Sequence, residues 1–546
     1  MKLIALKIKR RQIEVWDNFI LNFNPTVLDV IRRDSQKSGY LNFEQYRHEL
    51  KIIGQYIKDD NTSLCRHNFR LNSHPNTIFW EEGCLRLYFY QGNTIQDSLQ
   101  INIEFWESGN LNVFLYEQNS RILDDISNSN IVCNEANKLY DNGFTDHNGV
   151  RNNLFQVKWI GKVYQNSSFP MYSDLKTVIN SLTDLYKIIL RCHNMKKLQD
   201  IIQHNYQLIF TGAPGTGKSF SANELAENLT GYTQDNAIFK NRVEFVQFHP
   251  SYDYTDFMEG LKPKKPKNGD VGGFELRNGI FKEFCRKAGV IERIIYQNPA
   301  ASNYTAILKD LDNACKGLSS NVKSFWQGWL NEKATQQQHD YSPNHLPIFV
   351  FIIDEINRAE LSKVFGELMY CLEPEYRGAK GAVKTQYSYM NTEETAFTRY
   401  DDDRFFIPSN LYIIGTMNDI DRSVEVFDFA LRRRFAWHEI KVKEVMRDVL
   451  TSIFIAKKNP YWGSKIDKLA TKADNLNSVI SSGPLNEHYH IGPSYFGKIV
   501  NYGNNDDAYQ KLWNNHLRLL IYEYVRGMGS ELEDKILTES KEAFFA

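Results

Sequence analysis

The chain has 546 residues, of which 42% are hydrophobic and 24% charged, and its formal net charge at pH 7 is −1. This length exceeds a single hydrophobic core, and a domain size of ~100–200 residues predicts about three or four domains. The composition is that of a globular protein, so disorder is not expected. The near-neutral charge excludes a chain that coats nucleic acid by bulk charge, so any contact with DNA must be local.

Cysteine usage and the apolar runs limit the compartment and the class of site. Seven cysteines are scattered without a C-x-x-C pair, so neither a disulfide framework nor a zinc site is predicted. The apolar run after Met1 is too short for a signal peptide, and no stretch approaches the ~20 apolar residues of a membrane span. We therefore expect a cytoplasmic protein without a membrane partner.

Residues 1–170 are predicted to form an independent α+β domain. Apolar residues alternate with period two over 101–105 and again over 111–115, and a Glu-Ser-Gly-Asn turn separates the two runs. This pattern is typical of a β-hairpin. Further strands are expected over Cys84–Tyr90 and Phe155–Trp159.

The rest of the chain is predicted to form an α/β unit followed by helices. Apolar residues recur at helical spacing over 171–200, so we expect a connecting helix there. From 201 to 440 short apolar strands alternate with helical patterns, which predicts a mostly parallel sheet covered by helices. Within this unit, residues 291–346 are polar and are interpreted as an insertion. Strand signals fade afterwards, so 441–546 are predicted to be a helical lid.

A glycine-rich segment, Gly212–Ser219, has the G-x-x-x-x-G-K-[ST] spacing of a phosphate-binding P-loop. Backbone N–H groups of such a loop wrap phosphates, the lysine reaches the outer phosphates, and the hydroxyl binds Mg²⁺. A buried strand, Gln207–Phe210, is expected before the loop, and the helix after it points its N-terminus at the phosphates. The candidate nucleotide-binding residues are Gly212, Ala213, Pro214, Gly215, Thr216, Gly217, Lys218, Ser219 and Phe220.

Asp354 and Glu355 directly follow an apolar strand that ends at Ile353. The carboxyl ends of parallel strands form the edge at which doubly wound folds bind ligands. Phosphoryl transfer depends mainly on positioning and charge neutralisation. We therefore expect Asp354 and Ser219 to hold Mg²⁺ and Glu355 to orient the attacking water. A surface acidic pair is the alternative interpretation, which the P-loop disfavours.

A third segment with candidate chemistry follows the apolar strand Leu411–Gly415. Asn418 offers a neutral donor beside the terminal phosphate and the water. Arg432, Arg433 and Arg434 follow soon afterwards, and guanidinium groups bind phosphates in a bidentate manner. One of these arginines is a candidate arginine finger for the nucleotide of a neighbouring subunit. A solvated basic helix end is the alternative.

The segment Met417-Asn418-x-x-Asp421-Arg422-Ser423, followed by Asp428–Phe435, closely resembles the signature of McrB-type motors in methylation-dependent restriction systems. The resemblance covers roughly 200–530, and supporting matches lie at Val246–Tyr252, Asp256–Phe257, Gly279–Phe281, Asp354–Ala359 and Ile491–Phe496. It implies an AAA+ P-loop NTPase fold with a mostly parallel sheet and a C-terminal helical lid.

The resemblance also implies an activity and partners. Motors of this type form rings, usually hexamers, hydrolyse GTP rather than ATP with Mg²⁺, and drive a separate McrC-like nuclease subunit. By position, Asn418, Asp421 and Arg422 would form the signature loop with catalytic roles, and Arg433 or Arg434 would act across the subunit interface.

Nucleotide preference rests on the resemblance alone, and ATP stays open. The N-K-x-D element of small G-proteins is absent from its working place, because Asn137-Lys138 precedes the P-loop and lacks the aspartate. Asp419 and Ile420 also stand where the best-known version of the family has Thr and Ala, and the insertion is long. These departures bear on which nucleotide is preferred and on the details of the partner.

In this family the N-terminal region is variable and commonly recognises DNA, often a modified base. Base flipping requires an aromatic-lined pocket and polar groups that read the base edge. The aromatic candidates are Trp80, Tyr88, Tyr90, Trp106 and Trp159. Aromatic residues at alternating strand positions are more often core residues, so DNA binding through this domain is a hypothesis by analogy.

Three functions are compatible with these motifs. The first is the GTP-driven subunit of a McrBC-like restriction or anti-phage complex. The second is an ATP-dependent, MoxR-like remodelling protein that does not bind DNA, and the third is a nucleotide-gated sensor that recruits an effector. The Asp421-Arg422-Ser423 signature favours the first. The best candidate for a nuclease core, Glu531–Lys535, lies in a predicted helix, so the chain is not predicted to cleave DNA itself.

Overall fold

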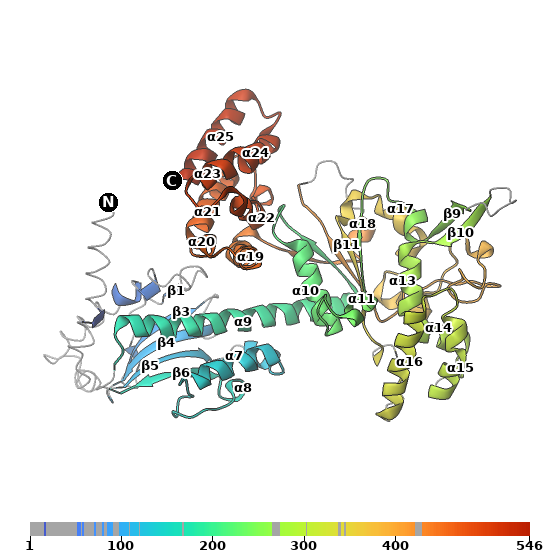
Figure 1. Cartoon of the computed structure of the whole chain (residues 1–546), viewed down its shortest axis with the longest axis horizontal. Coiled ribbons are helices and arrows are strands. Elements are labelled where there is room, and N and C mark those ends of the chain that lie inside the picture. Colours follow the sequence, from blue (N-terminus) through green and yellow to red (C-terminus); the bar gives the residue numbers. More distant parts are fainter. Residues whose placement is uncertain are drawn as a thin grey trace. The chain divides into compact units, whose positions relative to one another are not determined.

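A computed structural model of the chain describes residues 16–17, 52–55, 57–58, 70–71, 79–80, 84–90, 98–106, 108, 110–118, 121–165, 169–264, 273–301, 303–336, 340–342, 345–420 and 429–546. The chain divides into two compact units, 1–197 and 198–546 (Figure 1). Apolar residues form one large buried cluster in the first unit and two in the second.

The N-terminal unit is built on an antiparallel sheet in the order β1-β3-β4-β5-β6, with β2 beside β3. The predicted hairpin is present as β4 and β5, whose register pairs Ile103 with Val113. The strands span Arg70–Leu71 (β1), Phe79–Trp80 (β2), Cys84–Tyr90 (β3), Leu99–Trp106 (β4), Leu111–Glu117 (β5) and Trp159–Tyr164 (β6).

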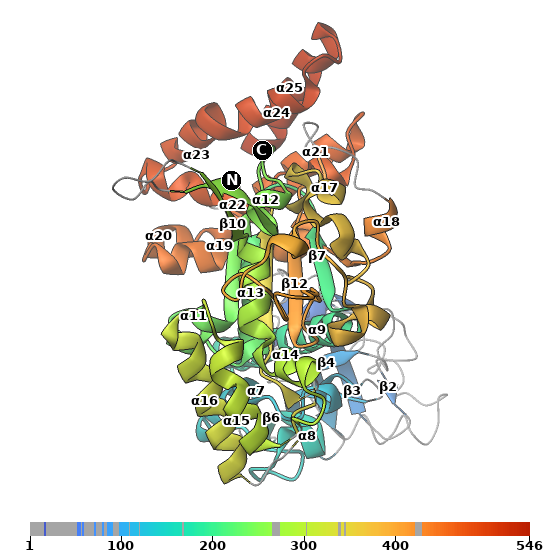
Figure 2. The same ribbon diagram turned by 90° about the vertical axis from the view of Figure 1, so that its right-hand side faces the viewer.

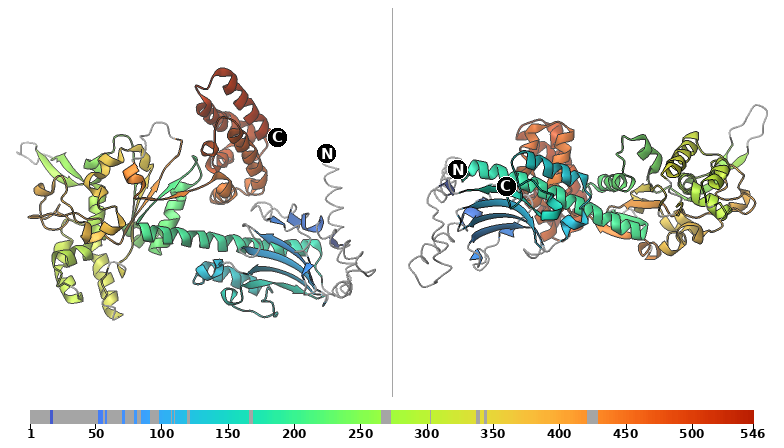
Figure 3. Two further views of the ribbon diagram at one scale, coloured as in Figure 1. Left: turned by 180° about the vertical axis from the view of Figure 1, so that it is seen from behind. Right: turned by 90° about the horizontal axis from the view of Figure 1, so that it is seen from below.

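A long helix, α9 (Tyr172–Asn205), covers the apolar face of this sheet (Figure 3). Ile101 and Val113 on the sheet belong to one buried cluster with Leu175 and Leu182 of the helix. Alternation along the strands places these apolar residues on a single face. The shorter helices of this unit are α6 (Ile122–Asp125), α7 (Asn130–Asp141) and α8 (Leu154–Val157).

The strand predicted over Phe155–Trp159 is wrong for all but its last residue. Residues Leu154–Val157 form helix α8, because the side chain of Asn153 accepts a hydrogen bond from the Phe155 N–H and caps the first turn. Lys158 then adopts a left-handed conformation with φ of 52°, and β6 begins at the next residue. A four-residue apolar run does not distinguish a helical turn from a strand.

The second unit contains a five-stranded sheet in the order β13-β7-β12-β11-β8. All its neighbouring strands are parallel, as predicted, and Figure 2 shows β7 and β12 side by side. The edge strand β13 was not predicted. The strands span Gln207–Thr211 (β7), Val243–Gln247 (β8), Phe349–Asp354 (β11), Leu411–Thr416 (β12) and Ala436–Glu439 (β13).

Consecutive residues of β11 from Val350 to Ile353 are all fully buried. Because neighbouring strand residues point to opposite faces, this burial indicates that helices cover both faces of the sheet. Helix α10 contacts β7, β11 and β12, and Phe281 of α13 packs on Phe351 with ring centroids 5.0 Å apart. The helices are α10 (Lys218–Thr230), α11 (Ala237–Arg242), α12 (Tyr254–Phe257), α13 (Ile280–Ala288), α14 (Val290–Gln297), α15 (Tyr304–Ala314), α16 (Ser320–Thr335), α17 (Leu361–Phe365) and α18 (Phe429–Arg432).

The segment 291–346, interpreted as an insertion, folds largely as helices that contribute to the main core. Ile294, Leu311, Trp326 and Leu330 are buried in the same cluster as the strands of the sheet. A hairpin of β9 (Glu259–Pro263) and β10 (Phe274–Asn278), which was not predicted, precedes these helices.

Residues after the sheet form a C-terminal helical region with its own apolar cluster around Met446, Leu469 and Trp513. The helices predicted there are present as α19 (Val442–Ala456), α20 (Pro460–Gly463), α21 (Ile466–Ser482), α22 (Pro493–Gly497), α23 (Asp507–Leu512), α24 (Arg518–Val525) and α25 (Ser530–Phe545). Among the residues that the structure describes, no helix is both long and apolar enough to span a membrane.

Candidate functional site

The phosphate loop, residues 212–217, connects β7 to α10 at the carboxyl edge of the parallel sheet. Gly215 has φ of 79°, a conformation that residues with a Cβ rarely adopt. Thr216 is buried and its hydroxyl donates a 3.0 Å hydrogen bond to the carbonyl of Ala213. The loop is therefore a tight, internally bonded turn at a helix N-terminus, the arrangement that binds anions.

Lys218 begins α10 and points its ammonium group back at the loop. Nζ donates hydrogen bonds of 2.9 Å to the carbonyl of Gly212 and 2.8 Å to that of Ala213. Burial lowers the pKa of Lys218 to about 8, and the nearby carboxylates of Asp419, Glu355 and Asp354 act in the opposite direction. A buried cation whose hydrogen-bond acceptors are neutral carbonyls favours an anionic ligand.

Ser219 and Asp354 are brought together from different elements. The Ser219 hydroxyl donates to Oδ1 of Asp354 at 2.7 Å, and the Thr416 hydroxyl donates to the same oxygen at 2.6 Å. Thr416 also accepts a 3.2 Å hydrogen bond from the backbone N–H of Glu355. Thr416 was not among the predicted site residues, although its place at the end of a buried strand beside Asn418 is a usable signal.

Glu355 and Asn418 form the second half of the site. Nδ2 of Asn418 donates to Oε1 of Glu355 at 2.6 Å. Oε2 of Glu355 lies 3.3 Å from Nε of Arg358 and accepts no hydrogen bond within the described part of the chain. Asn357 donates to the Asn418 carbonyl at 3.3 Å, so both ends of Asn418 are held and one carboxylate oxygen is left to accept from a ligand.

The donor set fits Mg²⁺ and a nucleotide triphosphate. Mg²⁺ prefers oxygen ligands and keeps several waters, and Ser219 and Asp354 present a hydroxyl and a carboxylate at one point. The buried ammonium of Lys218 and the N-terminus of α10 lie on the same side of the sheet. These residues fit the pair of ligands that the P-loop motif predicts.

The two candidate arginines differ in their surroundings. Arg434 pairs with Glu373, Nη2 to Oε1 at 2.9 Å, and its side chain is 11% exposed, whereas the Arg433 side chain is 69% exposed and its Nη2 lies 3.5 Å from the same oxygen. Arg432, also exposed, lies over the Trp437 ring. Of the two candidates, Arg433 is therefore the one that is presented at the surface.

Three predicted residues lie outside this cluster of contacts or outside the described residues. Phe220 follows Ser219 in α10, and its side chain is 55% exposed. Asp421 and Arg422 fall within 421–428, outside the described residues.

The C-terminal helical region touches the phosphate loop through backbone atoms. The N–H of Gly492 donates to the carbonyl of Pro214 and the N–H of Ser494 to that of Gly215, both at 3.1 Å. A Cβ at position 492 would overlap the backbone of Gly215 and Pro214. The tight contact therefore requires glycine at 492, a role that the sequence match at Ile491–Phe496 did not reveal.

The second face of the N-terminal sheet is polar and aromatic. Strand alternation and register place Tyr88, Tyr90, Trp106 and Trp159 on the face opposite the apolar core. The side chain of Trp80, the remaining aromatic candidate, lies outside the described part of the structure. On the same face Asn102 is 1% exposed, and Oδ1 of Asn102 and of Asn112 accept no hydrogen bond among the described residues. Trp159 stacks on Phe114 with ring centroids 4.7 Å apart. This contact is the packing role that was the alternative to base recognition.

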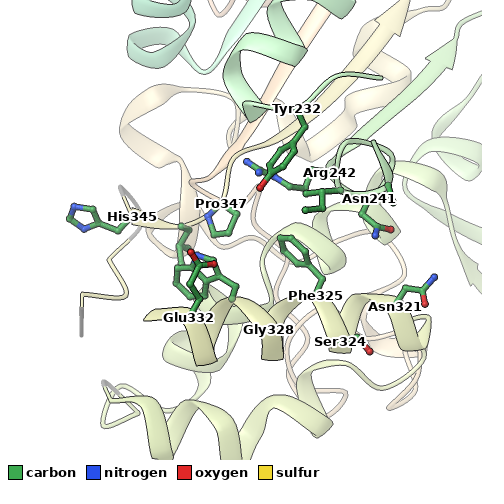
Figure 4. Close-up of a pocket in the computed structure, with 14 residues that line it drawn as sticks. Tyr232, Asn241, Arg242, Asn321, Ser324, Phe325, Gly328, Glu332, His345 and Pro347 are labelled. Carbon is green, nitrogen blue, oxygen red and sulfur yellow. The ribbon is translucent and has the colours of Figure 1, made fainter. Parts of the chain in front are cut away.

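One pocket in the described part of the chain lies away from these residues. It has a volume of about 730 Å³ and lies between α11 and α16, where Arg242 and Tyr232 face Phe325 (Figure 4). Arg242 precedes β8 and Pro347 precedes β11, so the pocket lies at the amino edge of the parallel sheet. The phosphate loop and Asp354 lie at the opposite edge.

Comparison with known proteins agrees with this geometry. Residues 207–435 match the model of the AAA domain of the dynein-related subfamily. The chain is 34% identical over 291 residues to the McrB subunit of a type IV methyl-directed restriction enzyme from Escherichia coli K12, which covers 53% of this chain and 47% of that protein. It is 26% identical over 242 residues to a component of the type II restriction enzyme BsuMI from Bacillus subtilis 168, covering 44% of this chain and 59% of that component.

The chain thus spans about half the length of the curated relatives it matches. Among solved structures, a DNA polymerase III gamma subunit-related protein from Thermotoga maritima aligns at 10% identity with a TM-score of 0.22, over 64% of this chain and 92% of that one. The family model and the identity to McrB confirm the resemblance expected from the signature residues. Residues 207–435 are therefore an AAA domain of the dynein-related subfamily, and the chain that carries it is McrB-like.

Proposed function

We propose that this chain is the GTP-hydrolysing motor subunit of a two-component, McrBC-like restriction or anti-phage complex. An AAA domain is a nucleoside triphosphatase module, and the two curated relatives are named as components of restriction enzymes. The observation that carries the proposal is the meeting of Lys218, Ser219, Asp354, Glu355 and Asn418 at one edge of the sheet. The motor acts as a ring, usually a hexamer, with a McrC-like nuclease subunit.

The described side chains divide the work of hydrolysis. Lys218 binds the outer phosphates, and Ser219 and Asp354 hold Mg²⁺, which when bound would neutralise charge on the phosphate oxygens. Glu355 accepts a hydrogen bond from the attacking water, and Asn418 orients the Glu355 carboxylate through its 2.6 Å hydrogen bond. Arg433 acts on the nucleotide of the neighbouring subunit, because it is the more exposed of the two candidates.

The polar face of the N-terminal sheet is where we place DNA recognition. Aromatic rings stack on extruded bases, and amide groups read base edges. Tyr88 and Asn102 are direct cross-strand neighbours on that face. The buried Oδ1 of Asn102 without a described partner supports a polar ligand there.

The decisive experiment measures steady-state hydrolysis of GTP and ATP by the full chain, alone and with methylated or unmodified duplex DNA. We expect GTP to be preferred and methylated DNA to stimulate its hydrolysis. Equal use of both nucleotides, or a preference for ATP, together with no response to DNA would replace this proposal with the remodelling function.

The partner is tested separately. A nuclease with a McrC-like arm encoded beside this gene should bind the chain only when nucleotide is present, and the complex should cleave DNA only during hydrolysis. Lys218→Ala is the matched negative, because it removes the phosphate-binding amine. A neighbouring gene product that cleaves equally well without this chain would contradict the two-component arrangement.

A further inference from the structure

Asp419 and His488 join the loop after β12 to the C-terminal helical region. Oδ2 of Asp419 lies 3.1 Å from Nδ1 of His488, and the Asp419 side chain is 13% exposed whereas that of His488 is 49% exposed. His488 lies in a short 3-10 turn, Glu487–Tyr489. The contact therefore connects two segments that are far apart in sequence.

On one side of the contact, Asp419 adjoins the residues that are proposed to orient the attacking water. Asp419 directly follows Asn418, whose side chain donates to Glu355 and whose carbonyl accepts from Asn357. Consecutive Cα atoms are only ~3.8 Å apart across a trans peptide. A shift of Asp419 is therefore passed to Asn418 and to the carboxylate that it orients.

On the other side stands the contact with the phosphate loop. His488 precedes Gly492 and Ser494 by four and six positions, and these two N–H groups donate to the phosphate loop at 3.1 Å. One short segment, 488–494, thus touches both the phosphate loop and the loop that carries Asn418. Segment 488–494 therefore connects the phosphate loop to the loop after β12 beside the candidate nucleotide site.

A second carboxylate explains why a histidine suits this place. Glu439 ends β13, and the ligand atoms of Asp419, Glu439 and His488 lie within 4.8 Å of one another. Two carboxylates this close repel each other. The imidazole lies near both carboxylates, so removing it leaves Asp419 facing Glu439 alone.

We propose that Asp419 and His488 are a positioning pair that couples the C-terminal helical region to Asn418, so that hydrolysis is fast only while segment 488–494 holds both loops. The proposal rests on the nucleotide hydrolysis proposed above. Neither side chain is placed against the reacting atoms. Asp419 is one of the carboxylates near Lys218, but the contact between Asp419 and His488 acts through Asn418 and Glu355. The pair should therefore affect turnover more than nucleotide binding.

The kinetic test uses Asp419→Ala, His488→Ala and the double variant in the full chain. Each single change should lower kcat about 10-fold. In His488→Ala, which keeps the carboxylate near Lys218, KM should stay within about twofold, because misplacement of a catalytic group slows the chemical step without removing uniform binding. The double variant should be no slower than the slower single, because both changes break one contact. His488→Asn, whose amide nitrogen replaces Nδ1, should recover most of the rate.

A matched control breaks a similar pair at the other edge of the sheet. Asp340 and His345 form an exposed contact of 2.6 Å, and Asp340→Ala should leave kcat and KM unchanged. Independent losses that multiply in the Asp419→Ala/His488→Ala double variant, or wild-type rates in both single variants, would overturn the coupling.

Hydrogen exchange separates this proposal from the proposed activity. Without nucleotide, the amides of Gly492 and Ser494 should exchange faster in Asp419→Ala and His488→Ala than in the wild type. If the wild type hydrolyses neither GTP nor ATP, the proposed function fails, and the exchange result alone decides the coupling. Unchanged exchange at both amides in both variants would refute it.

Discussion

Ser219 and Asp354 lie 135 positions apart in the chain, yet the Ser219 hydroxyl donates a 2.7 Å hydrogen bond to Oδ1 of Asp354. The same oxygen accepts from Thr416, which in turn accepts from the N–H of Glu355. Strands β7, β12 and β11 are neighbours in the sheet, and their carboxyl ends supply or precede all four residues. The groups proposed to hold Mg²⁺ are therefore organised by the fold itself.

Thr416→Val should break the hydrogen bonds that connect Asp354 to the backbone of Glu355. Valine keeps the shape of threonine but leaves Oδ1 of Asp354 and the Glu355 N–H each short of one hydrogen bond, at a cost of about 1–3 kcal/mol for a buried unsatisfied group. We expect a lower free energy of unfolding and a higher Mg²⁺ requirement for hydrolysis. Chemical denaturation and a Mg²⁺ titration measure the two effects. Thr416→Ser keeps the hydroxyl and should behave like the wild type; equal losses in both variants would point to packing instead.

Lys218→Met should make the protein more stable when no nucleotide is present. Burial lowers the pKa of Lys218 from 10.5 to about 8, so the unfolded chain holds the proton more tightly than the folded one. The contribution of this amine to stability is therefore lowest below pH 8 and rises as the pH increases from about 8 to 10.5. The shift corresponds to about 3 kcal/mol at neutral pH.

Thermal unfolding of wild type and Lys218→Met from pH 7 to pH 10.5 checks this sign. The difference between the two proteins should shrink as the pH rises. Added nucleotide should stabilise the wild type alone, because ligand binding to the folded state raises its apparent stability. A variant that is less stable at pH 7 would contradict the unfavourable burial of the ammonium.

Glu355→Gln should bind nucleotide and assemble but not turn over. The amide keeps the size of the side chain and can still accept from Asn418, yet it is a far weaker acceptor for a proton from water. Loss of such a group typically lowers kcat by ~10²–10⁴-fold. Single-turnover hydrolysis and nucleotide affinity are the measurements. Glu360→Gln, an exposed change five positions later, serves as the control, and a rate near wild type for Glu355→Gln would exclude the assigned role.

Alanine substitutions of Arg433 and Arg434 should differ in their effects, one on activity and the other on stability. Arg434→Ala removes the partner of Glu373 in a half-buried ion pair of 2.9 Å, so we expect a loss of about 1 kcal/mol in unfolding free energy. Arg433→Ala should change stability by less than about 0.5 kcal/mol but should reduce hydrolysis in assembled protein.

Mixing experiments assign the arginine that acts between subunits. Arg433→Ala subunits mixed with Glu355→Gln subunits should recover activity, because an intact Arg433 then faces an intact Glu355 at some interfaces. Recovery by Arg434→Ala instead of Arg433→Ala would reverse the assignment.

Lys282→Met should destabilise the AAA domain strongly. Lys282 is fully buried, 2.6 Å from Oε2 of Glu259, and donates to Asn391 at 3.1 Å. Removing one partner leaves a buried carboxylate without its cation, which typically costs about 3–5 kcal/mol. Denaturant unfolding measures this loss. Lys262→Met, which breaks an exposed 3.0 Å pair with Asp256, should cost less than about 1 kcal/mol, and similar losses in the two variants would contradict the role of burial.

Local patterns predicted the elements that carry strong periodicity or a motif. Period-two alternation located β4 and β5, and the P-loop spacing located the turn between β7 and α10. The same motifs predicted that Lys218, Asp354 and Glu355 gather at the carboxyl edge of a parallel sheet, since strand direction alone fixes which ends meet.

Contacts between distant segments were beyond the reach of sequence patterns. The pairing of Arg434 with Glu373 depends on how the segment before β13 packs, and no local pattern predicts which acidic residue the arginine meets. Strand β13 is only four residues long, too short for alternation to show. The apolar residues of α8 predict a strand, but the capping residue Asn153 determines the conformation of this segment more than they do.

Glu355 adopts φ of 52° and ψ of 46°, a left-handed conformation that costs a residue with a side chain roughly 1–2 kcal/mol. The backbone at this position would relax if glycine replaced glutamate, and the buried charge of Lys218 is likewise unfavourable for folding alone. Selection for thermal stability would therefore drive the chain toward inactive variants at these two positions. Consensus-based stabilisation of this protein should leave both residues fixed and improve packing elsewhere.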